Sequence, residues 1–350
     1  MCRVRIAAEQ DMPHPFLGAR YQELTTENMK MTLLYIMLAT LITACGSNGN
    51  SSSSSEAVVD TTVSSTVNRP PFDGEAAYAL TSQQCEFGPR VPATAAHAKC
   101  AEWLVNTLKA SCDTVMVQTG NVTTAKSGTL GIKNIIGVIN PDADQRLLLL
   151  AHWDTRPWAD NDPDPANHNK PVMGANDGAS GVAVLLQLAR ELHETGTTLG
   201  VDIVLVDAED MGETDNEESW GLGTQYWTQH PHVAGYKPLF GILLDMVGAS
   251  DATFSREYYS VQYASGFVDL VWKCAAGSHF RNVQGGAVTD DHVFVNQAGI
   301  PCVDIIDMRT DGESGFCPVW HTVNDTMAGI NASTLAEVGQ TLLNVIAELE

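Results

Sequence analysis

Five short apolar runs, each followed by a polar turn, constrain the fold of this chain more than any other feature. They are residues 134–139, 146–151, 201–206, 240–244 and 300–306. Runs of about four to eight residues that stay apolar at successive positions are typical of strands buried on both faces of a sheet. The runs therefore predict a central sheet that is covered on both sides.

Helical patterns lie between these runs. Residues 95–108, 178–192 and 333–349 carry apolar side chains at helical spacing, and Asp177 stands at the start of the second pattern. Strands that alternate with helices predict an α/β fold, here a three-layer sandwich with a mostly parallel central β-sheet flanked by helices. In such folds the active site lies beyond the carboxyl ends of the strands.

Ionisable residues collect at these strand and helix ends. Each apolar run in the middle of the chain leads into a histidine or a carboxylate, and one histidine follows a Gly/Cys/Pro loop near the end of the chain. The residues are His152, Asp154, Asp177, Glu209, Asp210, Asp245 and His321.

Taken alone, each of these residues also has a structural explanation. Asp177 could cap a helix, Asp245 could be a loop carboxylate, and a single His321 could be structural. Together, imidazole and carboxylate groups suit Zn²⁺, which in catalytic sites keeps three protein ligands and one open position. The neighbours Glu209 and Asp210 suit a division of labour between a proton shuttle and a metal ligand.

The beginning of the chain reads as an export and tether segment. Residues 1–28 match neither a signal nor a domain, and residues 46–69 form a flexible linker rich in Ser, Gly and Thr. Between them, residues 29–45 contain a short apolar run behind a lysine, as a signal peptide does. We expect translation to begin at Met29 or Met31, and residues 70–350 to form the catalytic domain.

The apolar run ends in Ile-Thr-Ala-Cys at residues 42–45, which resembles a bacterial lipobox. The resemblance implies cleavage before Cys45 and a lipid on its sulfur. The expected location is then the periplasmic face of a bacterial membrane, with the lipidated Cys45 as the anchor. An ordinary signal peptide or a membrane anchor are the alternatives.

Charge and cysteine content exclude further classes. The formal net charge is −23, whereas nucleic-acid binding requires clustered Lys and Arg, so a nucleic-acid partner is not expected. No Cys-x-x-Cys pair occurs, which argues against a zinc site built from thiolates. Beyond Cys45 six cysteines remain, and their pairing cannot be read from the sequence. We expect a monomer.

The order of the ionisable residues resembles the M28 zinc aminopeptidases from about Phe87 to the end of the chain. Within that superfamily, four stretches resemble the glutaminyl cyclases (glutaminyl-peptide cyclotransferases). They are FGPRVP at residues 87–92, LDMVGA at 244–249, DDH at 290–292 with GIP after it, and VWHT at 319–322.

The resemblance implies a single α/β domain with one zinc ion and a defined set of roles. The zinc ligands would be Asp177, Asp210 and His321, and Glu209 would be the general acid/base. Asp245 and Asp290 would be a hydrogen-bonded pair near the substrate. Trp320 would form a wall of the substrate pocket, and Trp220 is a candidate for a second wall or for packing.

Two positions depart from the cyclase pattern. The family often has Glu-Glu where this chain has Glu209-Asp210, and Glu213 is a possible substitute ligand because Asp is one methylene shorter. A cyclase histidine after the GIP strand appears here as Asp304.

The leading hypothesis is therefore a zinc-dependent glutaminyl-peptide cyclotransferase, which converts an N-terminal Gln of a peptide or protein to pyroglutamate and releases ammonia. The alternative is a two-zinc aminopeptidase, in which His152 and Asp245 would join a second metal and Asp177 would bridge the pair. A third hypothesis is an inactive binding domain on the same fold.

Overall fold

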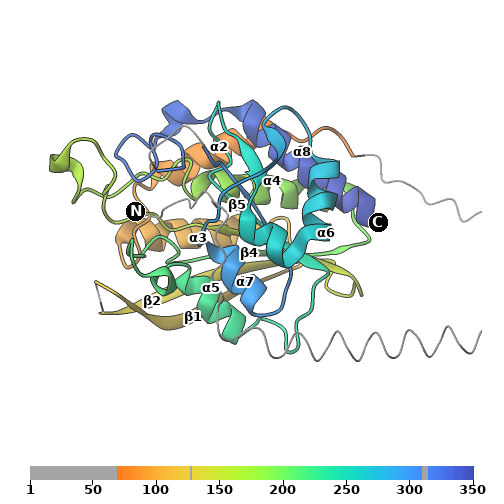
Figure 1. Ribbon diagram of the computed structural model, residues 1–350. Coiled ribbons are helices and arrows are strands. Elements are labelled where there is room, and N and C mark those ends of the chain that lie inside the picture. The colour runs from red at the N-terminus through yellow and green to blue at the C-terminus, as the bar shows by residue number, and fades with distance from the viewer. Residues whose placement is uncertain (1–68, 127, 310–313) are drawn as a thin grey trace, which may run out of the picture. The chain divides into compact units, whose positions relative to one another are not determined.

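The computed structural model describes residues 69–126, 128–309 and 314–350. A six-stranded sheet runs through the centre (Figure 1). In spatial order its strands are β1 (Thr114–Thr124), β2 (Gly128–Ile139), β4 (Gly200–Val206), β3 (Arg146–His152), β5 (Phe240–Asp245) and β8 (Cys302–Ile306). The last four strands are mutually parallel, whereas β1 and β2 are antiparallel to their neighbours. The predicted α/β sandwich with a mostly parallel sheet is confirmed.

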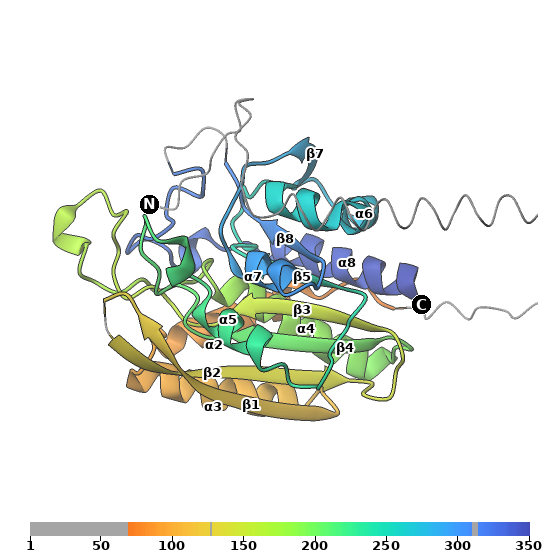
Figure 2. The same ribbon diagram turned by 60° about the horizontal axis from the view of Figure 1, so that its bottom comes forward.

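Helices cover both faces of the sheet (Figure 2). One face packs against α2 (Gly74–Glu86), α3 (Ala95–Lys109), α4 (Ala179–Thr195), α6 (Tyr258–Cys274) and α8 (Ala332–Leu349). The other face packs against the shorter helices α5 (Leu222–Gln229) and α7 (Asp291–Gln297). A two-stranded ribbon of β6 (Phe254–Arg256) and β7 (Phe280–Gln284) lies beside the main sheet, and three short 3-10 turns span 165–167, 217–219 and 327–329.

The four consecutive leucines of β3 show why the runs are apolar at every position. Leu147 and Leu149 belong to the core on the α4 side, and Leu148 and Leu150 belong to the core on the α5 side. All four are fully buried. Because successive side chains of a strand point to opposite faces, a strand with helices on both faces needs apolar residues throughout.

Asp177 does not cap α4, although its position before the helix suggested that role. The residue before the helix is Gly178, which makes no side-chain capping bond. A Cβ at Gly178 would lie 2.3 Å from the carbonyl oxygen of His152, so only glycine permits this close approach of the helix start to β3. The carboxylate of Asp177 is thereby left for the functional site.

Several predictions fall on the beginning of the chain. The segments 1–28 and 29–45 and all but the last residue of the predicted linker 46–69 lie outside the described residues. Arg69 already belongs to the folded domain, because its guanidinium pairs with Glu350. In the described part, no helix combines the length and apolar character that a membrane crossing requires. The six cysteines from Cys85 onward are free thiols.

Candidate active site

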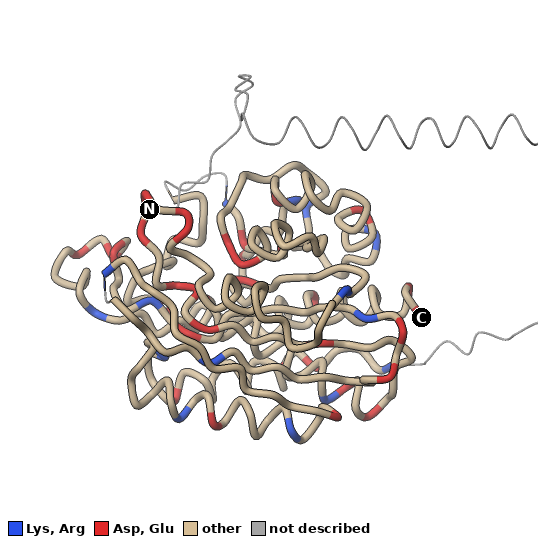
Figure 3. Tube along the Cα trace, turned by 90° about the horizontal axis from the view of Figure 1, so that it is seen from below, with Lys and Arg blue, Asp and Glu red and all other residues tan. Residues whose placement is uncertain are grey.

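The predicted site residues meet at the carboxyl edge of the parallel strands. His152 ends β3, Glu209 and Asp210 follow β4, and Asp245 ends β5. Asp177 stands just before α4, and His321 comes from the long connection between β8 and α8. Acidic stretches gather in the loops at this end of the molecule, on the left of Figure 3. The topology therefore places the whole set at the edge expected for an α/β active site.

Three turns of the site contain a non-glycine residue in the left-handed backbone region. They are Ala208 before Glu209 (φ 55°), Met246 after Asp245 (φ 51°) and His321 itself (φ 56°). Left-handed conformations are uncommon for residues with a Cβ and persist only where the surroundings enforce them. Their coincidence at three strand or loop ends marks this edge as a functional site.

Buried carboxylates hold the backbone of these turns. Asp154 accepts hydrogen bonds from the amides of Glu209 and Asp210, at 3.1 and 3.3 Å. Asp325 does the same for the amides of Asn176 and Asp177, at 2.8 and 3.1 Å. Asp154 and Asp325 thus fix the backbone that carries the candidate site carboxylates Asp177, Glu209 and Asp210.

One group of side chains has the arrangement of a metal centre. Nε2 of His321 lies 3.1 Å from Oδ1 of Asp210 and 3.5 Å from Oδ2 of Asp177, and all three residues are buried. Ligand atoms about 2.0–2.2 Å from a tetrahedral zinc ion lie roughly 3.3–3.5 Å from one another. The donor set of two carboxylates and one imidazole therefore fits zinc in both chemistry and spacing.

A second group shares Asp177 with the first. Nε2 of His152 lies 3.0 Å from Oδ1 of Asp177 and 3.2 Å from Oδ1 of Asp245. Burial alone would lower the pKa of His152, but hydrogen bonds to Asp154, Asp177 and Asp245 raise it well above its ordinary value. The surrounding carboxylates thus favour the charged form of His152, and the residue is placed to be a further metal ligand if a second ion binds.

A narrow cavity opens onto both groups. It measures about 30 Å³. Polar atoms come from the carboxylates and His321, and apolar surface comes from Ile306 of β8 and from loop residues such as Met246. Its lining consists of Asp177, Glu209, Trp220, Asp245, Met246, Val288, Thr289, Asp290, Ile306, Phe316, Trp320 and His321.

Burial dominates the electrostatics of the cavity. Burial raises the pKa of Glu209 well above its usual range, and the neighbouring carboxylates of Asp290 and Asp210 add to this effect against the opposing charge of His152. Burial likewise raises the pKa of Asp245 to about 6 and that of Asp290 to about 7. Carboxyl groups that lie close together in a buried site favour their protonated forms, and groups with such shifted pKa values are typical of acid–base catalysis.

Both predicted tryptophans line the cavity. The ring of Trp320 stacks on the imidazole of His321 with centroids 3.8 Å apart, and the ring of Phe316 packs against that of Trp320 with centroids 4.5 Å apart. Trp220 lies parallel to His321 at a centroid distance of 6.1 Å, and its Nε1 donates to the carbonyl of Glu213. Trp220, which the sequence left between pocket wall and packing, is part of the pocket wall.

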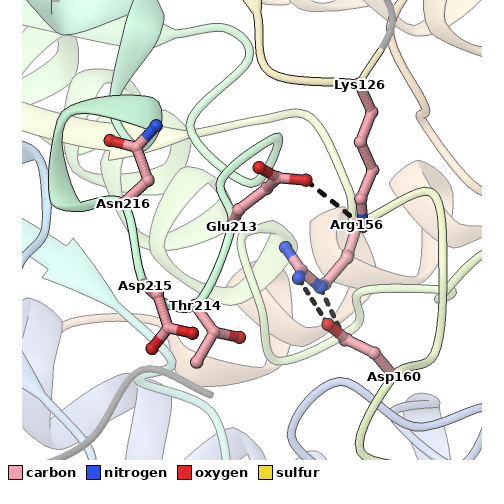
Figure 4. Close-up of a pocket in the computed structure, with 7 residues that line it drawn as sticks. All are labelled: Lys126, Arg156, Asp160, Glu213, Thr214, Asp215 and Asn216. Atoms are coloured by element: carbon pink, nitrogen blue, oxygen red, sulfur yellow. Dashed lines mark hydrogen bonds and ion pairs between the residues drawn. The ribbon is translucent and has the colours of Figure 1, made fainter.

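The alternative ligand Glu213 lies elsewhere. It lines a separate polar cavity of about 460 Å³ together with Lys126, Arg156 and Asp160 (Figure 4). Its carboxylate lies 3.9 Å from Nζ of Lys126. Among the described residues, Glu213 belongs to none of the clusters that could hold a metal ion. Asp210, despite its shorter side chain, is the carboxylate that reaches the cluster.

Comparison with known proteins agrees with this geometry. The sequence profile of peptidase family M28 matches residues 134–346. This range contains all the candidate metal ligands of the two groups described above. The chain belongs to peptidase family M28.

Among solved structures, a glutaminyl cyclase of Bacteroides thetaiotaomicron bound to N-acetylhistamine is 45% identical, with a TM-score of 0.77 over 80% of this chain and 99% of that chain. A Zn-dependent exopeptidase from Parabacteroides distasonis is 43% identical, with a TM-score of 0.78 over the same shares. A glutaminyl-peptide cyclotransferase of Bos taurus is 24% identical over 63% of this chain and 67% of its own length. The predicted family and fold are confirmed.

Sequence reasoning missed three supporting residues of this M28 site. Arg156 is buried and donates to both Asp160 and Asp210, and Asp160 lies 3.5 Å from Nδ1 of His321. Asp325 binds the backbone amides of Asn176 and Asp177, which are 149 and 148 positions away in the chain. No local pattern distinguishes these residues from ordinary loop polar residues, because their partners are distant in the chain.

Proposed function

We propose that the protein is a zinc-dependent glutaminyl-peptide cyclotransferase that acts on peptides and proteins with an N-terminal Gln. The observation that carries the proposal is the position of Glu209, a buried carboxyl with a raised pKa that lines the same narrow cavity as Asp177 and His321. The solved glutaminyl cyclases at 45% identity support the same activity. The rings of Trp220 and Trp320 on the cavity wall would pack along the methylene groups of a glutamine side chain.

The proposed metal is zinc, with one ion per chain. The fit of Asp177, Asp210 and His321 to tetrahedral spacing supports it, as does the Zn-dependent exopeptidase among the relatives. When bound, the ion would polarise the γ-carbonyl of the substrate and make its carbon more electrophilic. The ligands hold their places through Asp154, Asp160 and Asp325, which bind the backbone or imidazole behind them.

The proposed reaction forms one bond and breaks one. The α-amino nitrogen of the substrate attacks its own γ-carbonyl carbon, and the bond from that carbon to the amide nitrogen breaks as ammonia leaves. The carboxylate of Glu209 takes a proton from the attacking amine and passes it to the departing nitrogen. A carboxyl with a raised pKa serves both steps, because it holds the proton without retaining it too tightly.

The remaining side chains orient the substrate in this proposal. Asp245 and Asp290 line the cavity with raised pKa values, so in their neutral form they donate hydrogen bonds to the amide that departs. Trp220 and Trp320 enclose the substrate side chain and exclude water. Exclusion of water favours attack by the internal amine over hydrolysis.

An aminopeptidase is the second candidate, and the group of His152, Asp177 and Asp245 favours it. These atoms lie close enough to hold a second ion, with Asp177 as the bridge. In that case water activated by Glu209 would cleave the first peptide bond. An inactive binding domain, the third hypothesis, would leave a peptide unchanged.

Mass spectrometry of peptides incubated with the purified zinc-loaded domain separates these functions. We expect a Gln-initiated peptide to lose ammonia and keep every residue, a matched Leu-initiated peptide to stay intact, and a chelated sample to be inactive. Loss of the whole first residue from either peptide would contradict the cyclase and support the peptidase. Metal analysis of the same sample should find one zinc per chain for the cyclase and two for the peptidase.

We further propose that the domain is a monomer tethered through a lipid on Cys45 to the periplasmic face of a bacterial membrane. Arg69 donates to the carbonyl of Gly196, at the end of α4, and α4 begins at the active-site edge. The tether would therefore join the domain at the edge opposite the active site. Incorporation of labelled palmitate, abolished in Cys45→Ser, tests the anchor, and sedimentation of residues 70–350 tests the monomer.

A further inference from the structure

A buried cluster of ionisable residues lies behind the cavity wall. It consists of Glu257, Asp290, His292 and Asp304, and we refer to these four residues as the rear cluster. None is more than 3% exposed. Nε2 of His292 lies 3.0 Å from Oε2 of Glu257, and Nδ1 lies 3.4 Å from Oδ2 of Asp304. The imidazole therefore stands between two carboxyl groups.

The rear cluster is connected to the cavity wall at two points. Asp290 lines the cavity and is the N-cap of α7, and one atom each of Asp290, His292 and Asp304 lie within 4.8 Å of one another. Glu257 accepts the amide of Val288, another lining residue, at 3.1 Å. A change in the rear cluster would therefore move the wall that carries Asp290.

Unsatisfied polar atoms concentrate in the rear cluster. Apart from the 3.4 Å approach of Nδ1 of His292 to Oδ2 of Asp304, no described residue is a hydrogen-bond partner for these two atoms, for Oδ2 of Asp290 or for Oδ1 of Asp304, and all four atoms are buried. Buried polar atoms are almost always paired, so this concentration requires a physical account. One carboxyl oxygen of Asp290 and one of Asp304 lie within 4.8 Å of each other, and two buried carboxylates at that separation repel, which favours protonation of one of them. A hydrogen shared between the two carboxyl groups would satisfy atoms on each side.

The charges agree with one ionised and one neutral carboxyl on either side of His292. Burial alone would raise the pKa of Glu257, but His292 and two backbone amides hold it below its usual range. Burial, together with Asp290 and Glu257, raises the pKa of Asp304 well above its usual range. The other charged groups that face Asp290 are Asp245, Asp291, His152 and Glu209.

We propose that Glu257, His292 and Asp304 are positioning residues, which hold the carboxyl of Asp290 at the cavity through a hydrogen shared by Asp304 and Asp290. The ionised Glu257 fixes the imidazole, the imidazole orients Asp304, and Asp304 orients Asp290. This proposal rests on the proposed function, because it makes Asp290 a group that contacts the substrate. It also gives Asp304 a role of its own at the position where the sequence departs from the cyclases.

The substitution Asp304→Asn tests the proposal because it keeps the shape and removes the acidic hydrogen. We expect kcat to fall about 10- to 100-fold, as for other residues that orient a catalytic group, with KM within about twofold of the wild type. Zinc content should stay unchanged. The melting temperature should stay equal or rise, because a buried acid is removed.

Asp202→Asn is the matched control. Asp202 is an equally buried carboxylate, but it binds Arg146 and Tyr236 at the opposite end of the sheet. Its substitution should lower the melting temperature and leave kcat unchanged. A positioning role predicts that Asp304→Asn lowers kcat without loss of stability, whereas Asp202→Asn lowers stability without loss of kcat. A merely structural role of Asp304 would make the two variants behave alike.

Two results would overturn the proposal. One is a kcat for Asp304→Asn within twofold of the wild type. The other is the loss of a bound metal ion from this variant, which would make the rear cluster a metal site. His292→Asn provides a second variant. In the double variant His292→Asn/Asp304→Asn, the fold reduction of kcat should be smaller than the product of the two single reductions.

Failure of the proposed function gives a different result from failure of this proposal. If the wild type releases no ammonia from a Gln peptide, the cyclase function fails, and thermal unfolding then tests the shared hydrogen. Asp304→Asn should exceed the wild type in melting temperature by a margin that grows from pH 5 to pH 8, because only the wild type must keep the hydrogen as pH rises. An equal margin at all pH values contradicts the shared hydrogen.

Discussion

The carboxylate of Asp160 lies 3.5 Å from Nδ1 of His321, the ring nitrogen opposite the one that faces Asp177 and Asp210. Arg156 holds this carboxylate in place with a 2.7 Å hydrogen bond from Nε. A carboxylate behind a metal-ligating histidine fixes the tautomer and the orientation of the ring. Asp160 is therefore the residue that prepares His321 for metal binding.

Asp160→Asn should weaken zinc binding about 10- to 100-fold, because an amide orients the imidazole less firmly and removes its counter-charge. Competition with a chelator of known affinity measures the change. Asp164→Asn is a matched control, since Asp164 lies in the same loop but only caps the turn at 165–167. Equal zinc affinity in the two variants would contradict the role of Asp160.

Glu209→Gln should lower kcat about 10²- to 10⁴-fold, because the amide cannot carry the proton between the two nitrogens of the substrate. Its zinc content should equal that of the wild type. Glu213→Gln serves as the control and should retain both zinc and turnover, since Glu213 lines the separate polar cavity of Figure 4. Loss of zinc from Glu213→Gln would instead make Glu213 a ligand.

Gly212→Ala should raise KM for a Gln peptide severalfold. A Cβ at this position would lie 2.0 Å from the ring of Trp220, so the ring would have to move away from the cavity that it lines. The measurement is steady-state ammonia release over a range of peptide concentrations. Gly266→Ala, in open space on α6, is the control and should leave KM unchanged.

Asp291→Asn should make the protein more stable at pH 8 than the wild type, with a margin that shrinks toward pH 5. Asp291 is fully buried, and burial together with Asp290 raises its pKa to about 8. A carboxyl whose pKa is raised on folding contributes stability below its unfolded pKa of about 4 and loses that contribution as pH rises through the folded value.

The wild type should therefore lose up to about 1.4 kcal/mol per pH unit from this one group between those two pKa values. Thermal unfolding at several pH values measures the loss. The exposed Asp142→Asn is the control and should follow the wild-type profile. A margin for Asp291→Asn that does not grow with pH would show that the buried carboxyl is not protonated in the folded state.

Much of the sheet was predictable because buried parallel strands need apolar residues on both faces. The run 146–151 matches β3 to within one residue, and 201–206 matches β4 equally well. β1 was missed because it is an edge strand with one neighbour, where exposed and half-buried residues alternate. α2 was missed because its buried face consists largely of small or polar residues, such as Ala77, Thr81 and Gln84.

The site was predictable in its members but not in its pairings. The chain order alone placed Asp177, Glu209, Asp210, Asp245 and His321 at one edge of the sheet. It could not decide between Asp210 and Glu213, because that choice depends on the course of the turn after β4. The backbone there is held by Asp154, which comes from the end of another strand.

By itself the sequence determined the α/β architecture, the edge that carries the site and the residue types gathered there. Those properties depend on local periodicity and on the order of strand ends, which are written along the chain. Only the tertiary structure decided which carboxylates bind backbone amides, which face His321, and which meet His292 behind the cavity. Those pairings join residues such as Glu257 and His292, 35 positions apart, and they depend on how helices and turns pack around the sheet.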